Sequence, residues 1–267
     1  MMPELASKFP RGLSQVENCH FASDSLLLAR FADRYLPAKP VYCAELGCGC
    51  AAVLCGLALL RSDLQGVGFE IEREHIHCAE NNLRDLSLTS RLKIVQSDLR
   101  KDELSPYQGL FTAVLANPPF FESREGRPSH SLLRNQAQRG ELALTFFTQK
   151  ASSLLRHHGL FFCIYPAYKL QELSVSLAKN RLGLRTLLPV ASFPESPCRR
   201  VLVCASKNAA AHCVLLPPLV LHVRHGEQRF SDQALTFCPW LGAGHQTEQN
   251  KSQDACSQNV LASTEQL

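Results

Sequence analysis

Short apolar runs alternate with longer segments of helical periodicity along most of this chain of 267 residues. Apolar runs that close on Gly, Pro or Asp predict buried strands, and apolar residues three or four positions apart predict helices. The strands that we expect span residues 41–46, 66–71, 92–96, 110–115, 160–165, 184–190 and 201–205. The helices that we expect span residues 24–35, 53–60, 72–86, 141–155 and 168–182.

This alternation of strands and helices predicts an α/β fold. We expect a doubly wound, mostly parallel sheet of seven strands with helices on both faces, in a domain that covers residues 1–207. Residues 208–242 predict a small β-rich C-terminal extension. Residues 243–267 are polar and poor in aromatic side chains, which favours a disordered tail.

The composition narrows the class of protein. With 45% hydrophobic and 19% charged residues, the chain can bury a sizeable core. The formal net charge of +4 is compatible with a nucleic-acid partner but does not indicate one. The 12 cysteines include no Cys-x-x-Cys pair, so we expect no metal site and a reduced, cytoplasmic protein.

Membrane and secretory segments are also missing from the pattern. No apolar stretch approaches the ~20 residues that a membrane-spanning helix needs. Within the N-terminal region, Arg30 interrupts the apolar run Leu26–Ala29, so a signal-peptide layout is not expected. We therefore expect no membrane partner, and a monomer is the favoured state.

The strand at 110–115 ends abruptly at two consecutive prolines. Proline fixes φ near −65° and lacks an N–H donor, so the chain leaves the sheet in a stiff, extended bend. This bend presents the Asn117 carboxamide, the Pro118 carbonyl group and the Phe120 ring. Two hydrogen-bond acceptors beside a flat apolar face suit a planar group that carries an NH₂.

A glycine-rich loop, Glu45-Leu46-Gly47-Cys48-Gly49-Cys50, follows the first strand and opens a helix. Its glycines, with Ala52 and Glu70, also fit a dinucleotide-binding fingerprint, so the loop alone is compatible with a nicotinamide cofactor or S-adenosylmethionine (SAM). Glu45 would repel a pyrophosphate but tolerates a ligand that carries an ammonium and a sulfonium. The bend at Asn117 has no role in hydride transfer, so SAM is favoured.

With these residues, the chain resembles the class I SAM-dependent methyltransferases that carry Asn-Pro-Pro-Phe or Asn-Pro-Pro-Tyr. Within that group it most resembles the bacterial tRNA (adenine-N6)-methyltransferases that modify the adenosine beside the anticodon of a valine tRNA. The similarity runs from about Phe21 to Lys207. The resemblance implies a Rossmann-like fold, SAM as cofactor, tRNA as substrate and methyl transfer to the N6 amine of an adenosine.

The resemblance also implies which residues bind the cofactor: Phe21, Asp24, Glu45, Gly47, Gly49, Glu70, Asp98 and Asn117. Phe21 and Asp24 lie in a segment similar to the N-terminal motif that closes over the methionine part of SAM. Glu70 matches the acid that holds the ribose hydroxyls, and Asp98 matches the residue that reads the adenine amino group. Ala51 departs from the family pattern, which usually has a third glycine there.

Asn117, Pro118 and Phe120 match the catalytic corner of the family. The Asn117 side-chain oxygen and the Pro118 carbonyl would each accept one N–H of the target amine, which turns the nitrogen lone pair toward the methyl donor. Phe120 would stack on the base. The residues expected to contact the substrate are Pro119, Phe121, Arg124, Arg127 and Arg134. A phosphate-contacting loop and a solvated surface loop are both compatible with these arginines.

Other functions share the same corner. The guanine N2 amine of ribosomal RNA and the glutamine amide of release factors are alternative targets. Release-factor enzymes usually carry an N-terminal helical domain, for which the residues before Phe21 leave no room. A SAM-binding protein without activity is a further alternative, because Ala51 departs from the pattern, but the intact corner at Asn117 argues against it.

Overall fold

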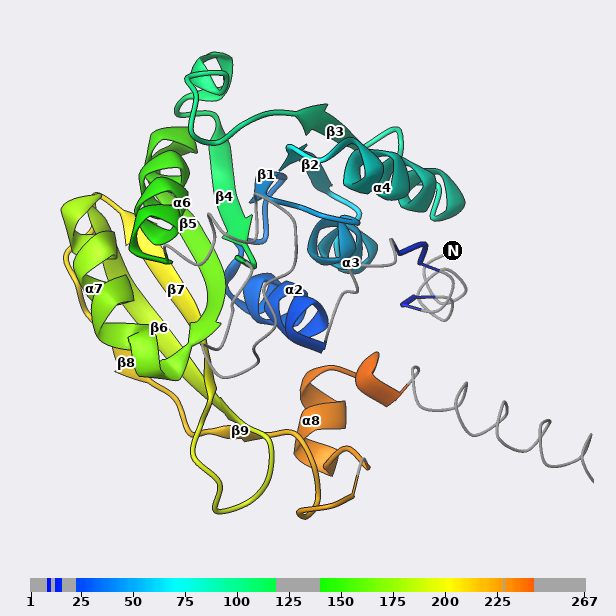
Figure 1. Cartoon of the computed structure of the whole chain (residues 1–267), viewed down its shortest axis with the longest axis vertical. Coiled ribbons are helices and arrows are strands. Elements are labelled where there is room, and N and C mark those ends of the chain that lie inside the picture. The colour runs from blue at the N-terminus through cyan, green and yellow to red at the C-terminus, as the bar shows by residue number, and fades with distance from the viewer. Residues whose placement is uncertain (1–8, 11–12, 16–22, 119–139, 228, 243–267) are drawn as a thin grey trace, which may run out of the picture.

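The computed structural model describes residues 9–10, 13–15, 23–118, 140–227 and 229–242 (Figure 1). The helices are α2 (Ser23–Tyr35), α3 (Ala52–Leu60), α4 (Arg73–Asp85), α6 (Gly140–Leu154), α7 (Leu170–Lys179) and α8 (Asp232–Phe237), with short 3₁₀ turns at η1 (Ser105–Tyr107) and η2 (Ala167–Lys169). The strands are β1 (Val41–Leu46), β2 (Leu64–Glu70), β3 (Leu92–Gln96), β4 (Phe111–Ala116), β5 (Leu155–Pro166), β6 (Leu182–Ala191), β7 (Arg200–Lys207), β8 (Val214–Leu215) and β9 (Leu219–Val220).

The described strands form one mixed sheet in the order β3-β2-β1-β4-β5-β7-β6-β8, with β9 also paired to β6. Strands β1 to β5 pair in parallel, whereas β7 runs antiparallel to both of its neighbours, β5 and β6. The predicted α/β fold with a mostly parallel sheet is therefore confirmed. The seven expected strands are present, and the short strands β8 and β9 add to the edge at β6.

Helices cover both faces of the sheet. Alternate residues of β4 belong to different cores: Ala113 and Leu115 face α2, α3 and α4, whereas Val114 and Ala116 face α6 and α7. Every residue of β4 is buried for this reason, which explains why its sequence is a continuous apolar run. Figure 1 shows α6 and α7 on the side of the sheet away from α2 and α3.

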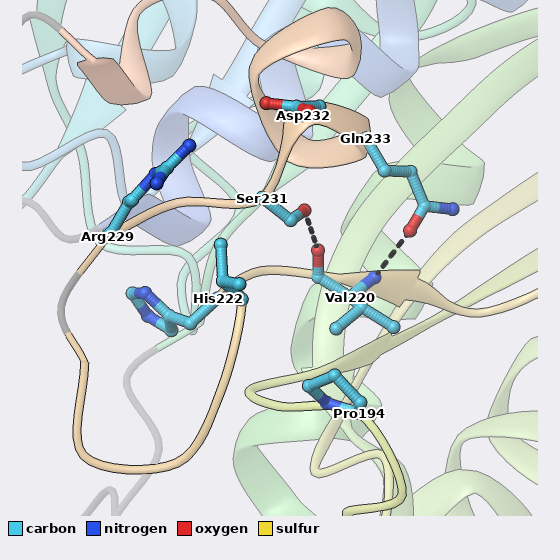
Figure 2. Close-up of a pocket in the computed structure, with 8 residues that line it drawn as sticks. Pro194, Val220, His222, Arg229, Ser231, Asp232 and Gln233 are labelled. Atoms are coloured by element: carbon cyan, nitrogen blue, oxygen red, sulfur yellow. Dashed lines mark hydrogen bonds between the residues drawn. The ribbon is translucent and has the colours of Figure 1, made fainter.

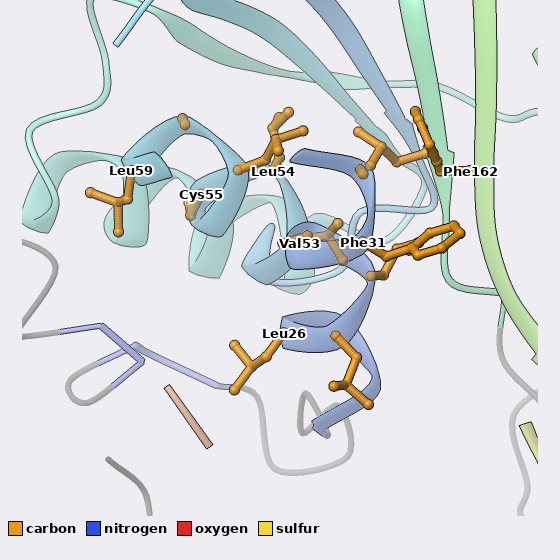
Figure 3. Close-up of a cluster of buried hydrophobic side chains, with 14 of the residues drawn as sticks. Leu26, Phe31, Val53, Leu54, Cys55, Leu59 and Phe162 are labelled. Atoms are coloured by element: carbon orange, nitrogen blue, oxygen red, sulfur yellow. The ribbon is translucent and has the colours of Figure 1, made fainter. Parts of the chain in front are cut away.

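The core on the α2 side holds that helix firmly against the sheet. Leu26 and Phe31 of α2 pack among Val53 and Leu54 of α3 (Figure 3). Phe31 also meets Phe162 of β5 edge to face, with ring centroids 6.1 Å apart. The burial of such side chains stabilises a fold by about 1.5–3 kcal/mol each. The position of α2 relative to β4 and β5 is fixed by this packing.

Residues 208–242 form two short strands and the helix α8, and so contain more than the expected β structure. They share the main core, because Phe237, Cys238 and Leu241 are buried in the cluster that contains α2 and α3. Trp240 packs edge to face on Phe9, with ring centroids 4.7 Å apart. The domain boundary at residue 207 stays a prediction, and the tail at 243–267 lies outside the described residues.

The largest differences from the predicted element boundaries are at the start of β5 and at the end of α7. Strand β5 begins at Leu155 instead of residue 160, because Leu155 already pairs with Phe111 of β4; the exposed residues Arg156 to His158 follow at a shift in register, where His158 has φ 58°. The helix expected over residues 168–182 ends at Lys179. Arg181 has φ 56°, which no α-helix accepts, and β6 starts directly after it. Polar residues in a strand and a left-handed arginine leave no signature in hydrophobic periodicity.

Candidate active site

The strand register brings the predicted cofactor residues to one edge of the sheet. Leu46 of β1 pairs with Phe69 of β2 and Ala116 of β4, so Gly47, Glu70 and Asn117 all follow at the same level. The chain turns to opposite faces after β1 and β4, since α3 and α6 lie on different sides. The carboxyl ends of two such strands border the crevice where open α/β sheets bind ligands.

The glycine-rich loop adopts the left-handed conformation three times. Gly47, Gly49 and Ala51 have φ values of 63°, 53° and 62°. The Cys48 N–H donates to the Phe69 carbonyl at 3.1 Å, which ties the loop to β2. A left-handed residue with a Cβ costs roughly 1–2 kcal/mol. Ala51 therefore keeps the conformation that a third glycine would have, at the expense of strain.

Glu70 holds this loop through its carboxylate. Oε2 accepts the Gly49 N–H at 2.8 Å, and Oε1 accepts the N–H groups of Ile71 at 2.8 Å and Glu72 at 3.1 Å. Burial raises the pKa of Glu70, but the nearby His75 imidazole and these N–H donors outweigh burial and leave the pKa below its usual value. A carboxylate has about four acceptor positions, so one remains for a ligand.

Glu45 is a second buried carboxyl at this edge, only 2% exposed. Its Oε2 accepts the Leu54 N–H in the first turn of α3 at 3.0 Å. Burial, with the charge of Glu70 nearby, raises the pKa of Glu45 to about 8, although the Leu54 N–H acts in the opposite direction. A cation placed beside Glu45 and Glu70 would favour the ionised form of Glu45.

Asp98 lies two residues beyond β3 and is bound by an arginine that the sequence did not single out. The Arg100 guanidinium donates from Nε to Oδ1 at 2.8 Å and from one terminal nitrogen to Oδ2 at 2.7 Å. This bidentate pair lowers the pKa of Asp98. The Asp98 side chain is 12% exposed and that of Arg100 is 47% exposed, so the arginine forms the outer, solvent side of the pair.

Asn117 is oriented by α2. Its side-chain nitrogen donates to the hydroxyl oxygen of Ser25 at 3.1 Å, and Ser25 is only 5% exposed. A carboxamide that commits its NH₂ group to one side presents its oxygen to the other. Pro118, which follows, is buried. The Asn117 oxygen is thus arranged as an acceptor.

Asp24, the neighbour of Ser25 in α2, is bound by the first residue of β7. Arg200, the first residue of β7, donates from Nε to Asp24 Oδ2 at 3.3 Å. Burial raises the pKa of Asp24 despite the attraction of Arg200. Adjacent residues of one helical turn therefore bind the end of β4 and the start of β7, which lie at the same edge of the sheet.

Other predicted residues lie outside the described part of the chain: Phe21, Pro119, Phe120, Phe121, Arg124, Arg127 and Arg134. The structure instead adds three residues that the sequence did not indicate. Ser25 contacts Asn117, Arg100 binds Asp98 and Arg200 binds Asp24. The local spacing of Asp98 and Arg100 offered a signal, whereas the other two pairs join distant segments.

The carboxyl groups at this edge of the sheet suit a cationic organic ligand. In the parts of the chain that the structure describes, no cluster of three His, Cys, Asp or Glu residues is arranged to hold a metal. The carboxyl groups of Glu45, Glu70 and Asp98 lie at or just beyond the carboxyl ends of three neighbouring strands, β1, β2 and β3. Within the same described ranges, no helix is both long and apolar enough to cross a membrane.

Solved structures place this fold among the methyltransferases. A "predicted O-methyltransferase" from Agrobacterium tumefaciens matches 82% of this chain and 96% of its own, with a TM-score of 0.64 and 19% identity. A precorrin-6y C5,15-methyltransferase from Geobacter metallireducens matches 74% and 95%, with a TM-score of 0.51 and 11% identity. The chain has the fold of the SAM-dependent methyltransferases.

A match of the sequence to a family model identifies the family. The model of the methyltransferase small domain matches residues 21–165, and the chain belongs to this family. It is a SAM-dependent methyltransferase, and the residues described above fit SAM as the cofactor. The prediction of SAM, rather than a nicotinamide cofactor, is thereby confirmed.

Curated relatives match this chain over part of its length. A tRNA1(Val) (adenine(37)-N6)-methyltransferase from Shewanella sp. (strain MR-4) is 27% identical over 61% of this chain and 69% of its own length. A second relative, the rRNA N(6)-adenosine-methyltransferase METTL5 of Danio rerio, is 35% identical over 29% of this chain and 36% of its own. Both names describe transfer to the N6 position of adenosine.

We expect Glu45→Gln to stabilise the cofactor-free protein more at about pH 8.5 than at about pH 5. The pKa of the free side chain is 4.5 and that of buried Glu45 is about 8. Between these values the folded state holds a proton that the unfolded state releases, so the free energy of unfolding falls as pH rises. Glutamine does not titrate and removes this fall. Urea unfolding across the pH range measures the difference.

Glu80→Gln, an exposed change in α4, is the matched control. It should leave the pH dependence of the free energy of unfolding as in the wild type. If Glu45→Gln and Glu80→Gln follow the same curve, Glu45 is ionised in the folded protein and the assignment of its proton is wrong.

Proposed function

We propose that this enzyme transfers the methyl group of SAM to the exocyclic N6 amine of an unpaired adenosine in tRNA, the one beside the anticodon of a valine tRNA. The observation that carries this proposal is the Asn117 carboxamide at the end of β4, turned by Ser25 so that its oxygen is an acceptor beside the glycine-rich loop. The names of the Shewanella relatives support the choice of tRNA, which would place the enzyme in the cytoplasm.

The chemistry needs a positioned amine more than a base. An aromatic exocyclic amine is a weak nucleophile because its lone pair is delocalised into the ring. In the proposed complex, the Asn117 oxygen and the Pro118 carbonyl each accept one N–H, which directs the lone pair out of the base plane. Positioning of this kind contributes at most ~7–11 kcal/mol, and fixed acceptors add electrostatic orientation.

When bound, SAM supplies an electrophilic methyl group on a sulfonium. We propose that Glu70 holds the ribose hydroxyls of SAM, that Asp98 meets its adenine amino group, and that Glu45 with the glycine-rich loop carries its methionine part. Glu70 has one acceptor position left after its three backbone N–H groups. Asp98 would have to share its carboxylate with Arg100, since both oxygens are bound.

The residues that would bind the substrate come directly after Asn117 and Pro118 in the sequence. Phe120 would stack on the adenine, a contribution of roughly 1–3 kcal/mol, with Pro119 and Phe121 beside it. Arg124, Arg127 and Arg134 would contact phosphates of the same loop. An unpaired loop adenosine reaches such a site without the cost of opening a duplex.

The proposal is tested by methyl transfer from labelled SAM to separate pools of tRNA, rRNA, DNA and protein, followed by nucleoside analysis. We expect label in tRNA as N6-methyladenosine, at one position of a valine tRNA. Label in rRNA adenosine would instead favour the activity named for the fish relative. Label only in guanosine or in protein, or in no pool, would contradict the proposal.

Ser25 is expected to act as a positioning residue for Asn117. Ser25→Ala removes the hydroxyl that accepts from the Asn117 side chain, and a neutral hydrogen bond contributes about 0.5–1.5 kcal/mol. We therefore expect kcat to fall roughly two- to tenfold, with little change in SAM affinity by calorimetry. Ser25→Thr keeps the hydroxyl and should restore most of the rate.

The double variant separates a positioning role from a general one. In an Asn117→Ala background, Ser25→Ala should cause no further loss, because the bond that it removes is already absent. An equal loss in both backgrounds would show that Ser25 acts on the reaction independently of Asn117.

A further inference from the structure

A pocket outside the site described above lies at the same edge of the sheet. Strand β6 runs antiparallel to β7, and β7 antiparallel to β5, so β6 ends at the edge where Asn117 stands. The turn after β6 and the segment after β9 border an open surface pocket of about 350 Å³. That volume is within the range of small-molecule sites. Its lining includes Pro194, His222, Arg229, Ser231, Asp232 and Gln233.

Hydrogen bonds fix the floor of this pocket. The Ser231 hydroxyl donates to the Val220 carbonyl at 2.6 Å, and the Gln233 side-chain oxygen accepts the Val220 N–H at 3.1 Å. Figure 2 shows both bonds, with Pro194 on the other side of Val220. The backbone of β9 is therefore satisfied by residues of the pocket, which leaves a preformed surface.

His222, one of the lining residues, belongs to a stack of rings. His222 lies between Phe230, at a centroid distance of 4.8 Å, and Phe193, at 5.4 Å. His225 packs on Phe193 at 4.8 Å. The His222 Nδ1 atom is buried and has no hydrogen-bond partner among the described residues.

Two charged residues, Arg229 and Asp232, also line the pocket. Arg229 is exposed, and no described residue binds its guanidinium, whereas nearby Arg224 is paired with Glu227. Asp232 also lines the pocket and offers a carboxylate acceptor. An unpaired guanidinium suits a phosphate. The rings of Pro194 and His222, with the Asp232 carboxylate as an acceptor, suit the face and the polar edge of a nucleobase.

We propose that this pocket binds an unpaired nucleotide of the RNA substrate, with its phosphate on Arg229 and its base against Pro194 and His222. The inference rests on the proposed function and extends it, because it adds a second contact to the same RNA. The pocket is placed for this role since it stands at the edge where the target amine would enter.

The test uses the full-length enzyme with a labelled valine tRNA transcript and fluorescence anisotropy at several salt concentrations. Arg229→Gln should raise the Kd for tRNA severalfold and reduce the salt slope by about one phosphate contact. Arg229→Lys should keep most of the slope. Arg156→Gln, an exposed change at the amino end of β5 on the opposite edge, is the matched control and should behave as the wild type.

The base contact is tested by competition. Oligoadenylate should displace the transcript better than inorganic polyphosphate of equal charge, and His222→Leu should remove that preference. Equal competition in wild type and variant would overturn the base contact. An unchanged Kd and slope in Arg229→Gln would overturn the phosphate contact.

Methyl transfer in the same preparations separates this inference from the proposed function. A wild type that methylates tRNA, with pocket variants that bind and react as it does, would overturn the pocket alone. A wild type that methylates no RNA would overturn the proposed function, and the pocket inference with it. The supporting result is a higher KM for tRNA in Arg229→Gln with kcat and SAM affinity retained.

Discussion

The hydrogen bonds of one buried carboxylate, that of Glu70, stabilise the edge of the sheet at which we propose that SAM binds. Glu70 accepts three backbone N–H groups, two from the turn after β2 and one from Gly49 in the glycine-rich loop. Each N–H left unsatisfied in a buried position would cost about 1–3 kcal/mol. The carboxylate thus ties the glycine-rich loop after β1 to the turn after β2.

Helix α2 makes a comparable connection on the other side of the crevice. Its packing against α3 and β5 fixes two adjacent residues, so that Ser25 meets Asn117 and Asp24 meets Arg200. The reacting corner is therefore oriented from outside its own strand. A change in the packing of Phe31 would reach Asn117 through this helix, although Phe31 touches neither cofactor nor substrate.

Much of the fold and of the candidate site was predictable from the sequence, for physical reasons that can be named. The bounds of β1 and β3 follow from apolar runs closed by Gly or Ser, and the cofactor residues follow motifs at strand ends. The contact of Ser25 with Asn117 was not predictable, because the residues are 92 positions apart and only helix packing joins them. The antiparallel direction of β7 had a signal: residues 192–199 are too few for a parallel crossover.

The most direct test of the account is single-turnover methyl transfer with Asn117 changed and SAM saturating. Asn117→Ala should lower the rate by about 10²–10³, as the loss of a preorganised polar group at a reacting centre does. Asn117→Asp keeps an acceptor of similar shape and should retain more activity than alanine. Affinity for SAM should change little in either variant. A full rate in Asn117→Ala, with SAM binding intact, would contradict the account.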